Sequence, residues 1–66
     1  MDSVSAIATS IRAARKKAGL TQADLADLAE VSERTVRAIE SATGNPSLRA
    51  VASVLGVLGL NLTVAR

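Results

Sequence analysis

Apolar residues recur at helical spacing in four separate stretches of this chain. Each stretch follows a residue suited to cap a helix: Ser3, Thr21, Ser32 and Ser47. The apolar residues at this spacing are Val4, Ile7, Ala8, Ile11, Ala14 and Ala18, then Leu25, Ala26, Leu28 and Ala29, then Val36 and Ile39, and finally Leu48, Val51, Ala52, Leu55 and Leu58. The pattern predicts an all-α domain of four helices, spanning residues 1–66.

The apolar pattern changes its period near the end of the chain. Gly56 weakens the fourth helix by about 1 kcal/mol relative to alanine, yet the helical spacing continues beyond it. We therefore expect this helix to reach Gly59 rather than to stop early. From 60 to 65 apolar and polar or small residues alternate, which predicts a short β-strand. The apolar face of that strand comprises Leu60, Leu62 and Val64.

A single strand leaves its backbone donors and acceptors without partners. No other segment of the sequence has a strand pattern, so the partner must come from another molecule. The simplest partner is a second copy of the chain across a two-fold axis, which predicts a homodimer. The alternative is a frayed C-terminal tail.

Composition narrows the classes of function. The 66 residues contain neither cysteine nor histidine, which excludes disulfides, thiol chemistry and Cys/His zinc sites. The chain also lacks a spaced carboxylate pair in a plausible cleft, so we expect no enzyme, metal or cofactor. The N-terminus has no basic segment followed by an apolar run, and nowhere are about 18 apolar residues consecutive, so we expect no secretion signal. We expect a cytoplasmic protein without membrane contact.

The net charge is only +2, but the basic residues are concentrated near the end of the first predicted helix. Arg12, Arg15, Lys16 and Lys17 form this cluster. Such a cluster suits nucleic-acid phosphates, and it equally suits a solvated helix end. Charge alone does not decide between these interpretations.

The second and third predicted helices, Gln22–Ala29 and Ser32–Ser41, are short and joined by a tight turn. This is the helix-turn-helix arrangement, here over residues 22–41. Ala26 is small enough to allow the close backbone approach of a steep helix crossing. The inward positions are all apolar: Leu25, Ala29, Val31, Val36 and Ile39.

The segment GLTQADLADLAEVSERTVRAIE, residues 19–40, resembles the Xre/Cro-type helix-turn-helix family of phage repressors and bacterial regulators. The Leu-Thr-Gln start, the Val-Ser turn exit, the Ile-Glu end and the following Asn-Pro-Ser-Leu agree in order and spacing. The resemblance covers roughly residues 11–64 and implies a lambda-repressor-like fold. Residues 54–62 are similar to the ending of HipB-like antitoxins, which dimerise through their C-terminal strand.

The resemblance also implies roles for individual residues. Gln22 matches a glutamine that binds a DNA phosphate and braces the reading helix. Arg15 and Glu40 match a partly buried ion pair between the first and third helices, for which we favour a structural role over DNA contact. Glu30 and Ala42 stand where the family usually has glycine. Either these residues adopt a left-handed backbone, at a cost of about 1 kcal/mol, or the turns differ.

The exposed N-terminal part of the third helix is the part that enters the major groove in this arrangement. Arg34 and Arg37 are suited to guanine, Glu33 to a cytosine amino group and Ala38 to a thymine methyl group. The alternative for Glu33 and Arg37 is a surface ion pair. Candidates for phosphate contact, some of which also cap helices, are Gln22, Thr21, Ser32, Thr35, Ser41 and Arg12.

These expectations describe a dimeric, sequence-specific repressor on an inverted repeat of double-stranded DNA. Its reading helices would lie about 34 Å apart in successive major grooves. The HipB-like resemblance adds a kinase-type toxin as partner and repression of the protein's own operon. The alternatives are an ordinary phage-type or chromosomal repressor, and a protein-interaction module without DNA binding.

Overall fold

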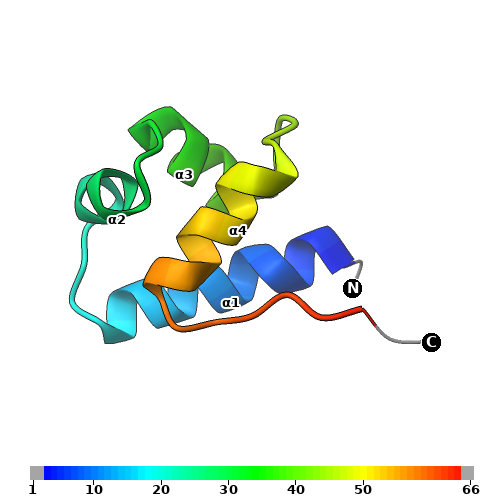
Figure 1. Ribbon diagram of the computed structural model, residues 1–66. Helices are drawn as coiled ribbons and strands as arrows, with labels where there is room; N and C mark the ends of the chain where they lie inside the picture. The colour runs from blue at the N-terminus through cyan, green and yellow to red at the C-terminus, as the bar shows by residue number, and fades with distance from the viewer. Residues whose placement is uncertain (1–2, 65–66) are drawn as a thin grey trace.

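The computed structural model describes residues 3–64, and its regular structure is entirely helical (Figure 1). The helices are α1 (Ser3–Lys17), α2 (Gln22–Ala29), α3 (Glu33–Ser41) and α4 (Leu48–Val57). The predicted four-helix, all-α fold is confirmed. α2 and α3 form the helix-turn-helix, and they sit above α1 in Figure 1.

α2, α3 and α4 begin where side chains satisfy their free backbone N–H groups, whereas Ser3, the predicted cap of the first helix, is itself the first residue of α1. The Thr21 hydroxyl accepts a hydrogen bond from the Asp24 amide at 3.0 Å, and the Asp24 carboxylate accepts one from the Thr21 amide at 3.0 Å. Ser32 and Ser47 cap α3 and α4 in the same way, each through its hydroxyl. Such caps each stabilise a helix by about 1 kcal/mol.

All four helices end in the same pair of backbone hydrogen bonds, closed by a residue in the left-handed region. Glycine occupies this position after α1 and α4, at Gly19 and Gly59. After α2 and α3 the position is held by Glu30 (φ 57°) and Ala42 (φ 55°). The turns therefore keep the usual geometry, and two side chains adopt the strained backbone. α4 passes through Gly56 as expected.

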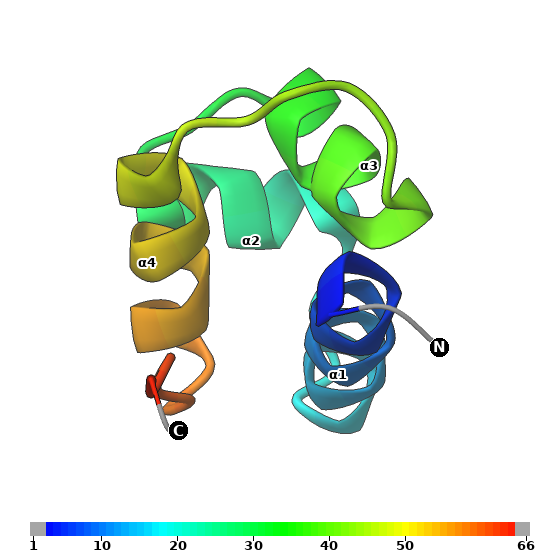
Figure 2. The same ribbon diagram turned by 90° about the vertical axis from the view of Figure 1, so that its right-hand side faces the viewer.

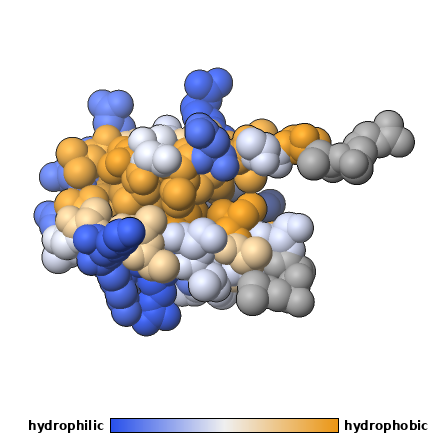
Figure 3. All heavy atoms as spheres, turned by 90° about the horizontal axis from the view of Figure 1, so that it is seen from below, coloured by the Kyte–Doolittle hydropathy of each residue, from blue (hydrophilic) through white to orange (hydrophobic). Residues whose placement is uncertain are grey.

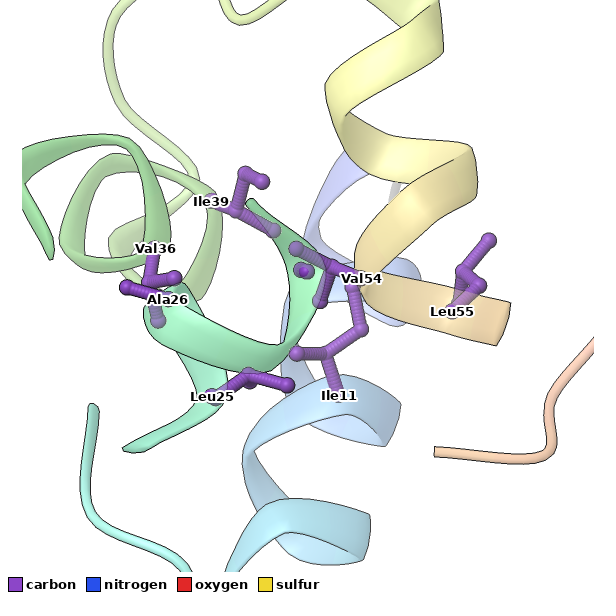
Figure 4. Close-up of a cluster of buried hydrophobic side chains, with 8 residues drawn as sticks. Ile11, Leu25, Ala26, Val36, Ile39, Val54 and Leu55 are labelled. Atoms are coloured by element: carbon purple, nitrogen blue, oxygen red, sulfur yellow. The ribbon is translucent and has the colours of Figure 1, made fainter. Parts of the chain in front are cut away.

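Each helix contributes one completely buried side chain to the core: Ile11, Leu25, Val36 and Val54 have no exposed surface. Figure 4 shows Ile11, Leu25 and Val54 converging between the helices, with Val36 beside Ala26. The chain has no aromatic residues, so small aliphatic groups fill this volume. The remaining members of the buried cluster are Ala26, Ala29, Ile39 and Leu55.

The buried face of α4 differs from the predicted one. Val54, which the spacing did not single out, is completely buried, whereas Leu48 is 71% exposed and Ala52 is exposed. α4 packs against α2 and more lightly against α3. Its stripe of Val54, Leu55 and neighbouring partly buried residues meets those helices. Leu48 and Ala52 consequently face away from the core.

Figure 2 shows α4 beside α2 and α1 below α3, so that each outer helix packs mainly against one helix of the pair. Beyond α4, Leu60 packs against the core and the segment from Asn61 to Val64 is exposed, without regular structure. No strand occurs within residues 3–64. Ala65, the end of the predicted strand, lies outside the described residues. The strand needs a second chain as partner, so it stays a prediction.

Candidate nucleic-acid interface

α3 lies at the upper edge of the molecule in Figure 1 and separates its apolar and polar side chains cleanly. Val36 and Ile39 face the core, whereas Glu33, Arg34 and Arg37 are exposed. Three of the four residues predicted to read bases therefore share the accessible face of one rigid helix.

Glu33 and Arg37 form an ion pair one helical turn apart. The Arg37 Nη2 donates to the Glu33 Oε2 at 2.6 Å, and the side chains are 47% exposed for Glu33 and 57% for Arg37. Such exposed pairs contribute only a few tenths of a kcal/mol to stability. The surface pair expected as the alternative is thus present in the DNA-free chain, and both groups remain accessible.

Ala38 has a different environment from the other three candidates. It is half-buried at the C-terminal half of α3, beside the loop that leads to α4. A Cβ built on Gly44 would lie 3.6 Å from the Ala38 Cβ, so the loop backbone lies close to this methyl group. Ala38 also lines a shallow hollow together with Arg34, Arg37, Ser41 and Thr43.

Arg15 and Glu40 link α1 to α3 through two parallel hydrogen bonds. Arg15 Nε donates to Glu40 Oε2 at 2.6 Å, and Arg15 Nη2 donates to Glu40 Oε1 at 3.0 Å. A third donor, Nη1, reaches the carbonyl oxygen of Leu20 at 2.9 Å. Only 12% of the arginine side chain and 4% of the glutamate side chain are exposed. This planar, two-bond geometry is the strong form of an ion pair.

Burial by itself would raise the pKa of Glu40, because it disfavours the charged carboxylate. Hydrogen bonds from Arg15 and Gln22, with the positive charges of Arg15 and Arg12, outweigh burial and hold the pKa of Glu40 below its ordinary value. The hydrogen bond to Glu40 raises the pKa of Arg15 in turn. The pair is therefore fully ionised near neutral pH, which suits a structural tie.

Gln22 stands at the start of α2 and extends this network. Its Nε2 donates to Glu40 Oε1 at 3.2 Å, so it braces α2 against α3. Together with Arg12, Arg15, Glu40 and Ser41 it lines a polar hollow between the first three helices. Three of the predicted phosphate contacts, Arg12, Gln22 and Ser41, are brought together there.

The other predicted phosphate contacts lie at helix starts. Thr21 and Ser32 are the exposed N-caps of α2 and α3, and their hydroxyls already accept backbone hydrogen bonds. Thr35 is half-buried, and its hydroxyl lies 2.8 Å from that of Ser32. These helix starts present a positive dipole end to an approaching anion.

The sequence did not predict two residues of this interface, Thr43 and Leu20. Thr43 borders the hollow with Arg34 and Arg37, although it lies beyond the helix-turn-helix segment. Leu20 contributes through its backbone carbonyl, which no side-chain pattern can reveal. The Asn-Pro turn downstream was the only signal that the chain folds back beside α3.

The described residues contain no cluster of three or more acidic, histidine or cysteine side chains able to hold a metal ion. None of the helices within residues 3–64 has the length and apolar character that crossing a membrane requires.

Comparison with known proteins agrees with this geometry. The chain superimposes on the HipB chain of the HipA-HipB-O2-O3 complex with a TM-score of 0.84 and 24% sequence identity, over 100% of this chain and 93% of that chain. No curated protein shows significant sequence similarity to it. The sequence profile of the family described as Helix-turn-helix matches residues 11–64. The chain therefore belongs to the Xre-type helix-turn-helix family and has a HipB-like fold.

Proposed function

We propose that this protein is a sequence-specific transcriptional repressor that binds double-stranded DNA. The observation that carries the proposal is the accessible polar face of α3 within a helix-turn-helix, where Glu33, Arg34 and Arg37 point outward. Arginine and glutamate side chains at these positions offer the donors and acceptors that base edges require. Its dimensions also suit the major groove, which admits one helix.

In this proposal the first two turns of α3 read base edges. Arg34 and Arg37 donate to guanine O6 and N7, Glu33 accepts from a cytosine amino group, and Ala38 touches a thymine methyl group. Each two-bond arginine–guanine contact discriminates against a wrong base by about 1–3 kcal/mol. The half-buried position of Ala38 limits it to a shallow contact.

Phosphate contacts set the register of the helix on the duplex without selecting sequence. Arg12, Gln22 and Ser41 border one polar hollow beside α3, a suitable place for a phosphate group. The helix starts add hydroxyls and backbone amides at Thr21 and Ser32, with Thr35 beside the latter. These contacts make binding weaker as salt concentration rises.

We propose further that the protein acts as a homodimer on an inverted repeat. Leu62 is 47% exposed and Val64 is 95% exposed, and the residues described here give no backbone hydrogen bond to the segment from Asn61 to Val64. Figure 3 shows apolar side chains gathered over the face seen from below. Pairing this segment, Leu60 to Ala65, with its copy would cover apolar groups and satisfy its backbone.

A second, more specific proposal is that the protein is the antitoxin of a toxin–antitoxin pair. HipB, whose fold it shares, is part of the HipA-HipB-O2-O3 complex. By analogy, this chain would bind a kinase-type toxin and repress its own operon. Co-purification of a larger partner encoded next to it supports this role. A neighbouring gene without toxin character, and no partner on affinity purification, would leave an ordinary phage-type or chromosomal repressor.

Selection from a pool of random duplexes tests the main proposal. The wild-type chain should enrich an inverted repeat, and the double variant Arg34→Ala, Arg37→Ala should lose or relax that preference. Absence of enrichment by the wild-type chain at moderate salt refutes sequence-specific repression. The helix-turn-helix would then serve as a protein-interaction module.

A further inference from the structure

We propose that Glu33, beyond its own contact with a base edge, also positions the Arg37 guanidinium for one base pair. Glu33 thereby increases sequence preference and lowers overall affinity for DNA. The inference rests on the proposed function and deepens it, because it separates two roles within the reading face of α3.

The geometry of the ion pair supports this division. The bond from Arg37 Nη2 to Glu33 Oε2 is short, at 2.6 Å, and joins residues one turn apart on a helix that Ser32 caps. Arginine has five N–H donors in a rigid planar fork. One bond to Glu33 therefore restricts the side chain and leaves donors free for the two acceptors of a guanine.

Arg34 provides the internal contrast. It occupies the same exposed face of α3, but the described residues give its guanidinium no hydrogen bond or ion pair. Binding DNA must therefore order the Arg34 side chain from a free set of rotamers. For Arg37, part of this ordering is already complete before DNA arrives.

The benefit of this arrangement is the ordering cost that Arg37 avoids on binding. Immobilising a long side chain weakens association by about 2- to 10-fold. A pre-oriented Arg37 avoids part of this loss of affinity, but only where a base offers acceptors in the expected place. At a wrong base pair the restricted guanidinium meets no matching acceptors, so Glu33 sharpens preference at the base pair that Arg37 reads.

The cost is the negative charge of Glu33. A carboxylate on the DNA-facing side of α3 repels phosphates at every sequence. Its removal should strengthen binding to unrelated DNA. It should also free Arg37 to contact a phosphate, which would steepen the dependence of log K on log salt by about 0.9. A purely structural role for Glu33 predicts neither change.

The experiment measures the affinity of full-length Glu33→Ala, Glu33→Gln and wild type for the selected operator, for operators changed at single base pairs and for random duplexes. Arg37→Ala first identifies the base pair that Arg37 reads. Glu33→Ala should reduce discrimination at that pair by up to about 2-fold, raise affinity for random DNA and steepen the salt dependence. Glu33→Gln, which keeps an acceptor oxygen, should retain part of the discrimination.

Glu30→Gln is the matched control, since it removes one acidic charge from the turn before α3 at a side chain without a recorded hydrogen bond. It should raise affinity for random DNA and leave discrimination at the Arg37 base pair unchanged. Circular dichroism verifies that every variant is folded. If wild type discriminates between sequences while Glu33→Ala retains full discrimination at that pair, the positioning role is refuted. If wild type itself shows no sequence preference, the proposed function fails instead.

Discussion

α3 carries one arginine–glutamate pair at each end, and the shortest nitrogen–oxygen distance is 2.6 Å in both. Their surroundings differ. Glu40, near the C-terminal end, is almost completely buried against Arg15 and also receives a bond from Gln22. At the N-terminal end, Glu33 and Arg37 remain about half exposed to water.

The difference teaches that burial, and not distance, separates the two roles. Losing a partner of the buried pair would leave a charge without water or counter-charge, a heavy cost. Losing a partner of the exposed pair lets water take its place. The C-terminal end of α3 is therefore held against α1 by a buried ion pair, whereas its N-terminal end is accessible to a ligand.

The largest effect should follow from breaking the buried pair. Glu40→Ala leaves the Arg15 guanidinium buried without its counter-charge and removes the acceptor of Gln22. We expect the free energy of unfolding to fall by about 3 kcal/mol. Urea denaturation followed by circular dichroism measures this change. A stability equal to that of wild type would show that the pair does not fasten α3.

Acid should weaken the buried pair of Arg15 and Glu40. The pKa of Glu40 is lowered in the fold, so its stabilisation is present above its ordinary value of 4.5 and is lost as pH falls through the folded pKa. Asp24, whose pKa is also lowered by its bonds with Thr21, follows the same direction.

Comparing wild type with Glu40→Gln isolates the Glu40 contribution, because the capping residues are identical in both. The difference in free energy of unfolding should shrink from neutral pH to about pH 3. A constant difference across this range would contradict the stabilising role of the ionised carboxylate.

The two left-handed residues that bracket the helix, Glu30 and Ala42, offer a smaller effect of opposite sign. Glu30→Gly and Ala42→Gly should each raise the free energy of unfolding by about 1 kcal/mol, because glycine adopts positive φ without a Cβ clash. The reciprocal control is Gly59→Ala. Its φ is 72° and a Cβ would meet nothing within 4 Å, so any loss of stability there comes from the backbone alone. Unchanged melting temperatures in the glycine variants would show that both turns are unstrained.

The smallest effect on stability should come from the exposed pair. Glu33→Ala should change the free energy of unfolding by no more than about 0.5 kcal/mol. Parallel denaturation of this variant and Glu40→Ala compares the two pairs directly. If the free energy of unfolding fell equally in the two variants, the two ion pairs would not differ in their contribution to stability.

Much of the helix-turn-helix could be predicted from sequence because local signals agree there. Five residues were expected to face inward. Leu25, Ala29, Val36 and Ile39 are buried, and Val31 is half-buried against them. Hydroxyl caps fix where α2 and α3 begin, and charged residues mark their outer faces.

α4 was harder because apolar residues lie on several of its sides. Periodicity favoured Leu48 and Ala52 and passed over Val54, although Val54 is the completely buried residue. Packing against α2 and α3, which the sequence does not display, selects the buried side. The charge network has the same origin: Arg15 and Glu40 are 25 positions apart, and only the family resemblance suggested that they meet.

The central claim is that the exposed end of α3 reads bases and contributes little to the fold. The most direct measurement is the ratio of affinities for the selected operator and a random duplex, for wild type and Arg37→Ala, at one salt concentration. We expect this ratio to fall by about 5- to 150-fold, with the free energy of unfolding unchanged within about 0.5 kcal/mol. An unchanged ratio in a folded Arg37→Ala variant would contradict the claim.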